Sequence, residues 1–85
     1  MTYRVRYLES VVRVDIPALP RSLRERIKRA IETKIAVNPI EFGKPLQYSL
    51  KGCRRLRVGD YRVVFIIEGD EVTIVKIGHR KEVYE

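Results

Sequence analysis

Two Gly-Asp pairs, Gly59-Asp60 and Gly69-Asp70, separate three segments of β-strand pattern in the second half of the chain. Such a pair between two β-patterned runs is typical of a two-residue hairpin turn. The first turn predicts three facing pairs: Val58 with Tyr61, Arg57 with Arg62, and Leu56 with Val63. Because side chains alternate between the two faces of a strand, we expect Arg55, Arg57 and Arg62 on one face of the sheet.

This arginine cluster is poorly explained by folding alone. Like charges that face each other across two strands destabilise a sheet, so Arg57 opposite Arg62 is unfavourable unless an anion lies between them. A guanidinium stays charged at physiological pH, and its planar fork matches a phosphate group. We therefore interpret Arg55, Arg57 and Arg62 as a phosphodiester site on a strand face. The alternative is three surface arginines with buried stems.

The charge balance also indicates an anionic partner. The chain has 85 residues, a formal net charge of +7 and a pI near 9.9. Five of the seven net positive charges lie between residues 44 and 62. This balance favours nucleic acid over an acidic protein surface as the partner. The length allows one small core and excludes a second, so we expect a single domain over residues 1–85.

Cysteine content and hydropathy limit the remaining classes. Cys53 is the only cysteine, so an internal disulfide is excluded, and without a Cys/His cluster we expect neither a metal nor a cofactor. A packed thiol is a simpler interpretation of Cys53 than a nucleophile. The apolar run Val63–Ile67 is too short to cross a bilayer, and the N-terminus lacks a signal-peptide core. We expect a cytoplasmic protein without membrane association.

Hydrophobic periodicity predicts an α+β fold in which two N-terminal helices pack on an antiparallel sheet. The predicted elements are a strand at 2–8, a short helix at 9–16, a helix at 20–37, a loop at 40–45 and strands at 46–50, 53–58, 61–68 and 71–79. The order is β-α-α-β-β-β, where 46–50 is either a short edge strand or an extended loop. Segment 61–68 is mostly apolar on both faces, which suits a central strand.

The outer face of the helix at 20–37 carries basic and acidic residues spaced four apart. They are Arg21, Arg24, Glu25, Lys28, Arg29 and Glu32. Alternating charge of this kind is more typical of a solvated helix face than of a binding site.

His79 is the only side chain whose ordinary pKa lies near neutrality, so it is a candidate acid or base. The alternative is a residue that simply ends the last strand. Strict alternation from the Gly69-Asp70 turn places His79 on the face of Arg62 and Arg80 on the opposite face.

Three blocks of this sequence resemble the RelE/ParE superfamily of bacterial and archaeal toxins. They are Asn38-Pro39 followed by Gly43–Leu46, the basic hairpin Leu50–Arg62, and the closing segment Ile77–Tyr84. The hairpin combined with a Gly-His-Arg-x-x-Val-Tyr ending is similar to the RelE branch, whose members cut messenger RNA in the ribosomal A site. ParE-type gyrase inhibitors share the fold and often lack the basic site.

The resemblance implies a metal-free cleavage in which the ribose 2′-hydroxyl attacks the adjacent phosphorus and leaves a 2′,3′-cyclic phosphate. The catalytic residues it implies are Arg55, Arg57, Arg62, Arg80 and Tyr84. Placing Arg80 with Arg62 then requires a β-bulge near Gly78. Further basic residues expected to bind RNA or the ribosome are Lys44, Lys51, Arg54 and Lys81. Arginine does not deprotonate near neutrality, so positive charge rather than a general base has to supply most of the catalysis.

The partners implied by the resemblance are a RelB-like antitoxin, the ribosome and mRNA, with DNA contacted only through the antitoxin complex. The chain would be the toxin of a type II toxin-antitoxin system and an endoribonuclease. Two alternatives stay open. One is a non-enzymatic, ParE-like gyrase inhibitor, which the missing general base favours. The other is a degenerate, nontoxic homologue that only binds antitoxin.

Overall fold

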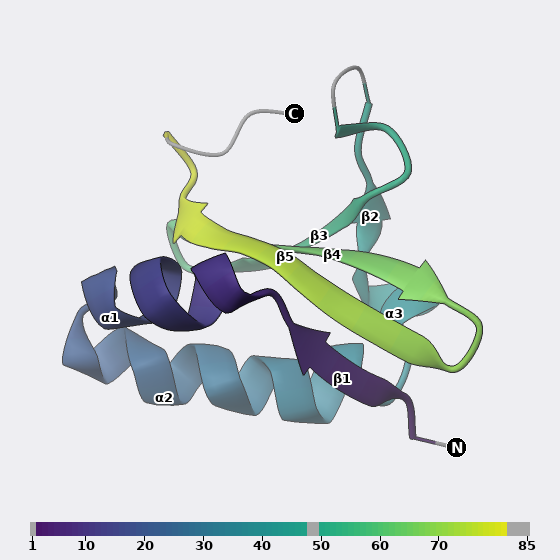
Figure 1. Ribbon diagram of the computed structural model, residues 1–85, viewed down its shortest axis with the longest axis horizontal. Helices are drawn as coiled ribbons and strands as arrows, with labels where there is room; N and C mark the ends of the chain where they lie inside the picture. The colour runs from purple at the N-terminus through teal and green to yellow at the C-terminus, as the bar shows by residue number, and fades with distance from the viewer. Residues whose placement is uncertain (1, 48–49, 82–85) are drawn as a thin grey trace.

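The computed structural model describes residues 2–47 and 50–81 and is built on a five-stranded sheet (Figure 1). The strands are β1 (Arg4–Tyr7), β2 (Lys44–Pro45), β3 (Arg54–Val58), β4 (Tyr61–Glu68) and β5 (Glu71–His79). Their order is β1-β5-β4-β3-β2, so β4 is an interior strand as predicted. The α+β fold is confirmed, but the sheet is mixed rather than antiparallel, because β1 runs parallel to β5. Two parallel strands that pair directly need a long connection, and here the helices and three strands separate β1 from β5 along the chain.

Two helical segments cover one face of this sheet (Figure 1). The first joins η1 (Val11–Asp15) to α1 (Ile16–Ala18), and the second joins α2 (Arg21–Ala30) to η2 (Ile31–Ile35). The sequence pattern predicts that the first helix ends before Pro17. The structure continues it to Ala18, because Pro17 occupies the first turn of α1, where its missing N–H costs least.

The hydrophobic core lies between these helices and the sheet. The helices contribute residues at helical spacing, namely Val11, Leu19, Ile27, Ile31 and Ile35. The strands contribute Leu56, Val58, Val63, Phe65, Val72, Ile74 and Ile77. All strand members of this core lie on the helix side, so the opposite face of the sheet is left for other roles.

The segment after η2 differs from the predicted loop at 40–45. A short helix, α3 (Pro39–Phe42), begins there because the Asn38 side chain accepts a hydrogen bond from the Glu41 amide at 3.2 Å. Strand β2 (Lys44–Pro45) follows and pairs with the start of β3, so the edge strand precedes the predicted 46–50 segment. The Asn-Pro pair therefore starts a helix as well as ending one.

Asp15 joins the first helical segment to the edge of β5. Its buried carboxylate accepts hydrogen bonds from the Ile77 amide at 2.9 Å and from Lys76 Nζ at 3.2 Å. Strand β1 ends at Tyr7, and the Leu8 amide makes one further bond to the Ile74 carbonyl at 3.1 Å. The Asp15 side chain thus satisfies a backbone donor that β1 is too short to reach.

Replacing Asp15 with alanine is expected to destabilise the fold by about 2–3 kcal/mol, because the buried Ile77 amide loses its acceptor. Chemical denaturation of both proteins measures this difference. Asp15→Asn is the matched control, since it keeps an acceptor oxygen and should lose clearly less. Equal stability of Asp15→Ala and the unsubstituted protein would contradict this role.

Candidate functional site

The β3–β4 hairpin has the predicted register. Arg57 pairs with Arg62 and Arg55 pairs with Val64 across the two strands. Gly59 adopts a φ of +62° in the connecting turn, which an L side chain rarely tolerates. Leu56, Val58 and Val63 are in the helix-side core. Alternation therefore places the three arginines together on the opposite face of the sheet, which we call the arginine face.

A β-bulge in β5 changes which closing residues reach the arginine face. Phe65 pairs with Ile74 but Val64 pairs with Lys76, so Val75 is an extra residue. The predicted bulge exists, but at Val75 rather than near Gly78. Beyond it Gly78 faces Arg62, and the Arg80 amide donates to the Asp60 carbonyl at 2.9 Å. Continued alternation brings Arg80 to the arginine face.

The same bulge moves His79 to the other face, so the expectation that His79 lies beside Arg62 is wrong. His79 pairs with Tyr61, and their rings meet edge to face with centroids 5.4 Å apart. The Lys81 amide donates to His79 Nδ1 at 3.1 Å, which leaves Nε2 as the protonated nitrogen of the neutral ring. These contacts fit a residue that terminates the strand.

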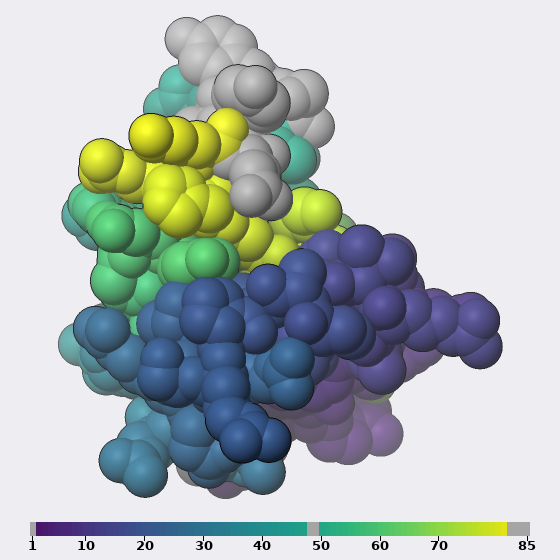
Figure 2. Space-filling model, turned by 90° about the vertical axis from the view of Figure 1, so that its left-hand side faces the viewer, coloured from purple at the N-terminus to yellow at the C-terminus, as the bar shows by residue number. Residues whose placement is uncertain are grey.

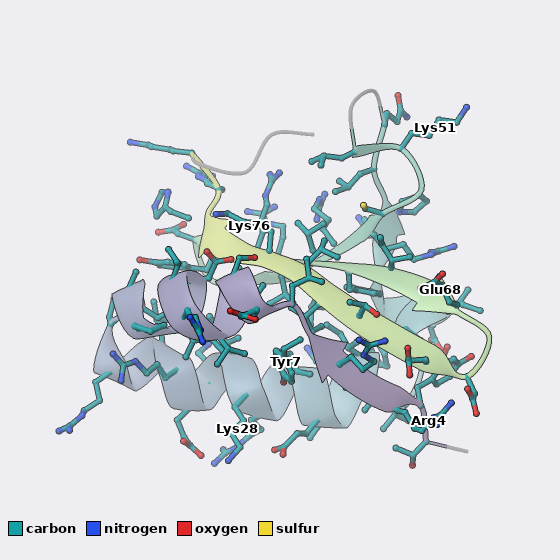
Figure 3. The ribbon with its side chains drawn as sticks, in the orientation of Figure 1. Arg4, Tyr7, Lys28, Lys51, Glu68 and Lys76 are labelled. Atoms are coloured by element: carbon teal, nitrogen blue, oxygen red, sulfur yellow. The ribbon has the colours of Figure 1, made fainter. Side chains whose placement is uncertain are left out.

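The other predicted basic residues are dispersed. Lys44 pairs with Arg55 and is exposed at the sheet edge on the arginine face. Lys51 extends from the loop before β3, far from β1 (Figure 3), and Lys81 is exposed after β5. Tyr84 lies outside the described residues.

Arg54 does not join this group. Its register places it with Phe65, on the helix side of the sheet. Its guanidinium donates to the carbonyls of Gly43 at 2.8 Å and Ile40 at 3.2 Å. Arg54 therefore holds α3 and the following turn against β3, and we leave it out of the site.

Two features near the arginine face were not predicted from the sequence. Next to Arg55, a small apolar cluster forms around buried Leu46 and Val64, with Leu50, Cys53 and Val75 against it. The bulge also places Lys76 opposite Val64, but its Nζ is paired with Asp15 at 3.2 Å, so its charge is not free for the site (Figure 3). An apolar floor lowers the local dielectric and so strengthens the field of the neighbouring guanidinium groups.

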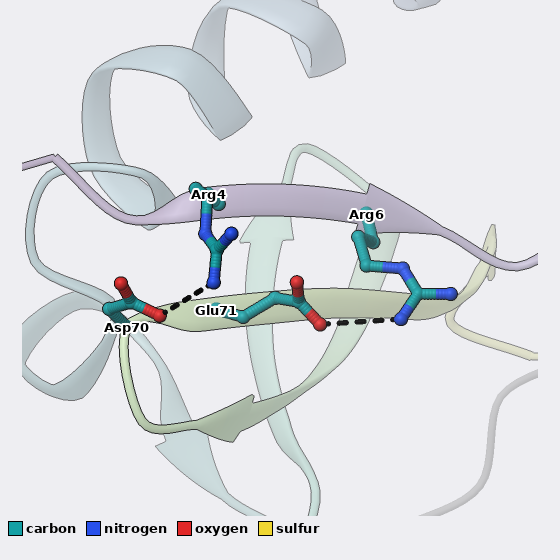
Figure 4. A network of polar contacts seen from close by, with 4 residues as sticks. All are labelled: Arg4, Arg6, Asp70 and Glu71. Carbon is teal, nitrogen blue, oxygen red and sulfur yellow. Dashed lines mark hydrogen bonds and ion pairs between the residues drawn. The ribbon is translucent and has the colours of Figure 1, made fainter.

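Charge is divided along this face of the sheet. At the end away from the arginines, Arg4 pairs with Asp70 at 3.1 Å and Arg6 pairs with Glu71 at 3.4 Å (Figure 4). Arg57, in contrast, has no carboxylate within 4.0 Å among the described residues. Within the described residues, Arg57 therefore carries a positive charge beside the β3–β4 turn that no carboxylate compensates.

Chemically, this arrangement is suited to binding and stabilising a phosphate. Within residues 2–47 and 50–81, no three His, Cys, Asp or Glu side chains gather into a group that could hold a metal ion. None of the helices described has the length and apolar character needed to cross a membrane.

The structure is that of a small α+β protein with a mixed sheet and a basic strand face. Comparison with known sequences identifies its family. Residues 5–84 match the family described as the ParE toxin of type II toxin-antitoxin system, parDE. The chain is 29% identical to toxin RelG of Mycobacterium tuberculosis over 99% of its length and 98% of that protein. It is 33% identical to toxin RelE of the same organism over 82% of this chain and 74% of that protein.

The fold comparison agrees. A crystal structure of the RelBE2 toxin-antitoxin complex from Mycobacterium tuberculosis superposes with a TM-score of 0.86 and 28% identity, covering 94% of this chain and all of that one. The chain belongs to the RelE/ParE superfamily. It is a RelE-family toxin of the type II toxin-antitoxin class.

Proposed function

We propose that this toxin is a ribosome-dependent endoribonuclease that cleaves mRNA in the A site. The observation that supports it most is Arg57 directly opposite Arg62 on the face away from the helices. Folding gains nothing from that pairing. A phosphate between the two guanidinium groups gains charge-assisted hydrogen bonds from both.

In the proposed reaction the ribose 2′-oxygen forms a bond to the adjacent phosphorus, and the bond from phosphorus to the 5′-oxygen breaks. The 2′-hydroxyl gives up its proton and the 5′-oxygen gains one, which leaves a 2′,3′-cyclic phosphate and a 5′-hydroxyl. Arg55, Arg57 and Arg62 stay protonated, so they act by stabilising negative charge on the phosphate oxygens in the transition state. Arg80 and Tyr84 complete the proposed catalytic set.

A second candidate function is inhibition of gyrase, because the matched family description is that of the ParE toxin. A paired assay separates the two. The purified protein is added to a reconstituted translation reaction and, separately, to a gyrase supercoiling reaction. We expect translation to stop with its mRNA cut and supercoiling to proceed. Inhibited supercoiling with intact mRNA would replace the proposal with the ParE-like function, and no effect in either assay would indicate a nontoxic homologue.

We also propose that a RelB-like antitoxin binds the groove between the two helical segments and β1. This groove has a volume of about 270 Å³, and its apolar lining is Tyr7, Val12, Ile16, Leu19, Ile27, Ile31 and Ile77. Burial and the charge of Glu32 raise the pKa of Tyr7, which keeps its hydroxyl neutral at the groove. Its charged lining residues are two cations, Arg24 and Lys28, and one carboxylate, Glu25. An amphipathic helix with acidic flanks complements such a groove.

Val12→Asp is expected to weaken antitoxin binding at least about tenfold, because it places a charge in the apolar contact. Calorimetric titration with the cognate antitoxin measures the dissociation constant. Val37→Asp is the control, since Val12 and Val37 are equally exposed at 52% and Val37 does not line the groove. Equal affinities for the two variants would contradict this placement.

A further inference from the structure

A second groove lies between the second helical segment and the β3–β4 turn, with a volume of about 240 Å³. Figure 2 shows this end of the molecule, where the green strands near the β3–β4 turn lie above the blue α2. The cations that line this groove are Arg26, Arg29, Lys34 and Arg57. Ala30, Thr33, Val58 and Gly59 form the rest of its wall, and none of the lining residues is acidic.

The two carboxylates of the second helical segment, Glu25 and Glu32, lie on the same side of it. Glu25 lines the apolar groove on the opposite side, and Glu32 is near enough to Tyr7 to influence its pKa. The stripe toward β3 carries Arg26, Arg29 and Lys34 instead. The alternating sequence predicts a solvated face of mixed charge. The structure turns both carboxylates toward β1 and leaves only cations beside β3.

These cations also lack internal compensation. Across the described ranges, none of the four forms an ion pair within 4.0 Å. Lys34 contacts the Phe42 ring, with Nζ 5.9 Å from its centroid. The Arg26 guanidinium lies against Gly59, where an added Cβ would come within 3.3 Å of its Nη1. Positive charges gathered around one groove repel one another unless an anion occupies it.

Arg57 connects this groove to the arginine face. It lines the groove and also faces Arg62 across the hairpin. Strand β2 pairs with β3 only at Arg54 and Arg55, so the described part of the chain places no strand along the outer edge at Arg57. A linear polyanion can therefore pass from the arginine face over this edge and into the groove.

We propose that this groove binds the sugar-phosphate backbone of RNA that adjoins the phosphodiester held on the arginine face. That the polyanion is RNA rests on the proposed function. The occupant is recognised by its regularly spaced phosphates rather than by its bases, because every charged side chain that lines the groove is cationic. The RNA is either the substrate strand beside the cut or ribosomal RNA that the bound toxin touches.

The test is a binding comparison of two variants that each remove two positive charges from the helical segments. Arg26→Gln/Arg29→Gln alters the groove, and Arg13→Gln/Arg21→Gln is the control, because neither Arg13 nor Arg21 lines this groove or the apolar groove. The probes are a 2′-O-methyl RNA oligonucleotide, which cannot be cut by 2′-hydroxyl attack, and vacant ribosomes. Thermal unfolding verifies that both variants remain folded.

For the groove variant we expect roughly tenfold weaker binding to at least one probe and about twofold or less for the control. On the oligonucleotide, the slope of log dissociation constant against log salt should fall by about 1.4, or about 0.7 for each lost phosphate contact. An effect on the oligonucleotide assigns the groove to the substrate strand, and an effect on ribosomes alone assigns it to ribosomal RNA.

Equal weakening by both variants, or unchanged binding of both probes by the groove variant, would overturn the proposal. So would a groove variant that loses affinity only for antitoxin, because the occupant would then be an acidic peptide. The readout does not depend on cleavage. A protein that binds RNA through the groove but cuts none would refute the nuclease function and leave the groove assignment standing.

Discussion

Arg57→Ala should reduce cleavage of ribosome-bound mRNA by about 100-fold or more, the effect typical of removing one fixed donor from a charge-stabilising site. Arg57 is exposed and its pairing with Arg62 is repulsive, so the fold does not depend on it. The variant should therefore unfold at the same denaturant concentration as the unsubstituted protein or slightly above it. Single-turnover cleavage rates at saturating ribosomes measure the catalytic loss separately from binding.

Two further variants make this result specific. Arg57→Lys keeps the charge but loses the planar fork, so it should retain part of the activity. Arg21→Ala removes an exposed arginine from α2, outside both the arginine face and the adjoining groove, and should cleave at the normal rate. Full activity of Arg57→Ala would show that the guanidinium does not contact the reacting phosphate.

Gly43→Ala should destabilise the protein by about 3 kcal/mol, which corresponds to a melting temperature lower by roughly 12–24 °C for a chain of this size. A Cβ at Gly43 would collide with the fully buried Phe65 ring and approach the Pro39 carbonyl oxygen to 2.8 Å. The φ of Gly43 is −99°, so the expected loss is steric rather than conformational. Differential scanning calorimetry gives both quantities.

Gly69→Ala is the informative control for this substitution. Gly69 has a φ of +62° but nothing within 4 Å of its Cβ position, so alanine there incurs only the left-handed backbone penalty of about 1 kcal/mol. A larger loss at Gly69 than at Gly43 would mean that close packing of Phe65 against α3 is not what fixes this part of the fold.

The sequence predicted the hairpin because its determinants are local. Gly59-Asp60 sets both the turn and the register, and the positions of Arg55, Arg57 and Arg62 follow by alternation. The bulge was harder to place. Val75 lies within an apolar β-branched run that carries no local signal for an extra residue, so the position of the bulge depends on packing against β4.

Other differences arise from contacts between distant residues. Arg54 is basic in sequence and adjoins the predicted site, yet its guanidinium is used by the carbonyls of Ile40 and Gly43. The parallel pairing of β1 with β5 joins residues near opposite ends of the chain, and the residue pattern of neither strand indicates its partner or its direction. The helix at Pro39, in contrast, had a readable signal in its Asn cap.

The most direct test of the central claim maps cleavage of a defined mRNA on programmed ribosomes, with ribosome-free RNA in parallel, and identifies the chemical ends of the products. We predict cuts within the A-site codon only when ribosomes are present. The upstream fragment should end in a 2′,3′-cyclic phosphate and the downstream fragment should begin with a 5′-hydroxyl. Intact mRNA, or cuts that leave a 3′-hydroxyl and a 5′-phosphate, would contradict 2′-hydroxyl attack on a phosphate held by the arginine face.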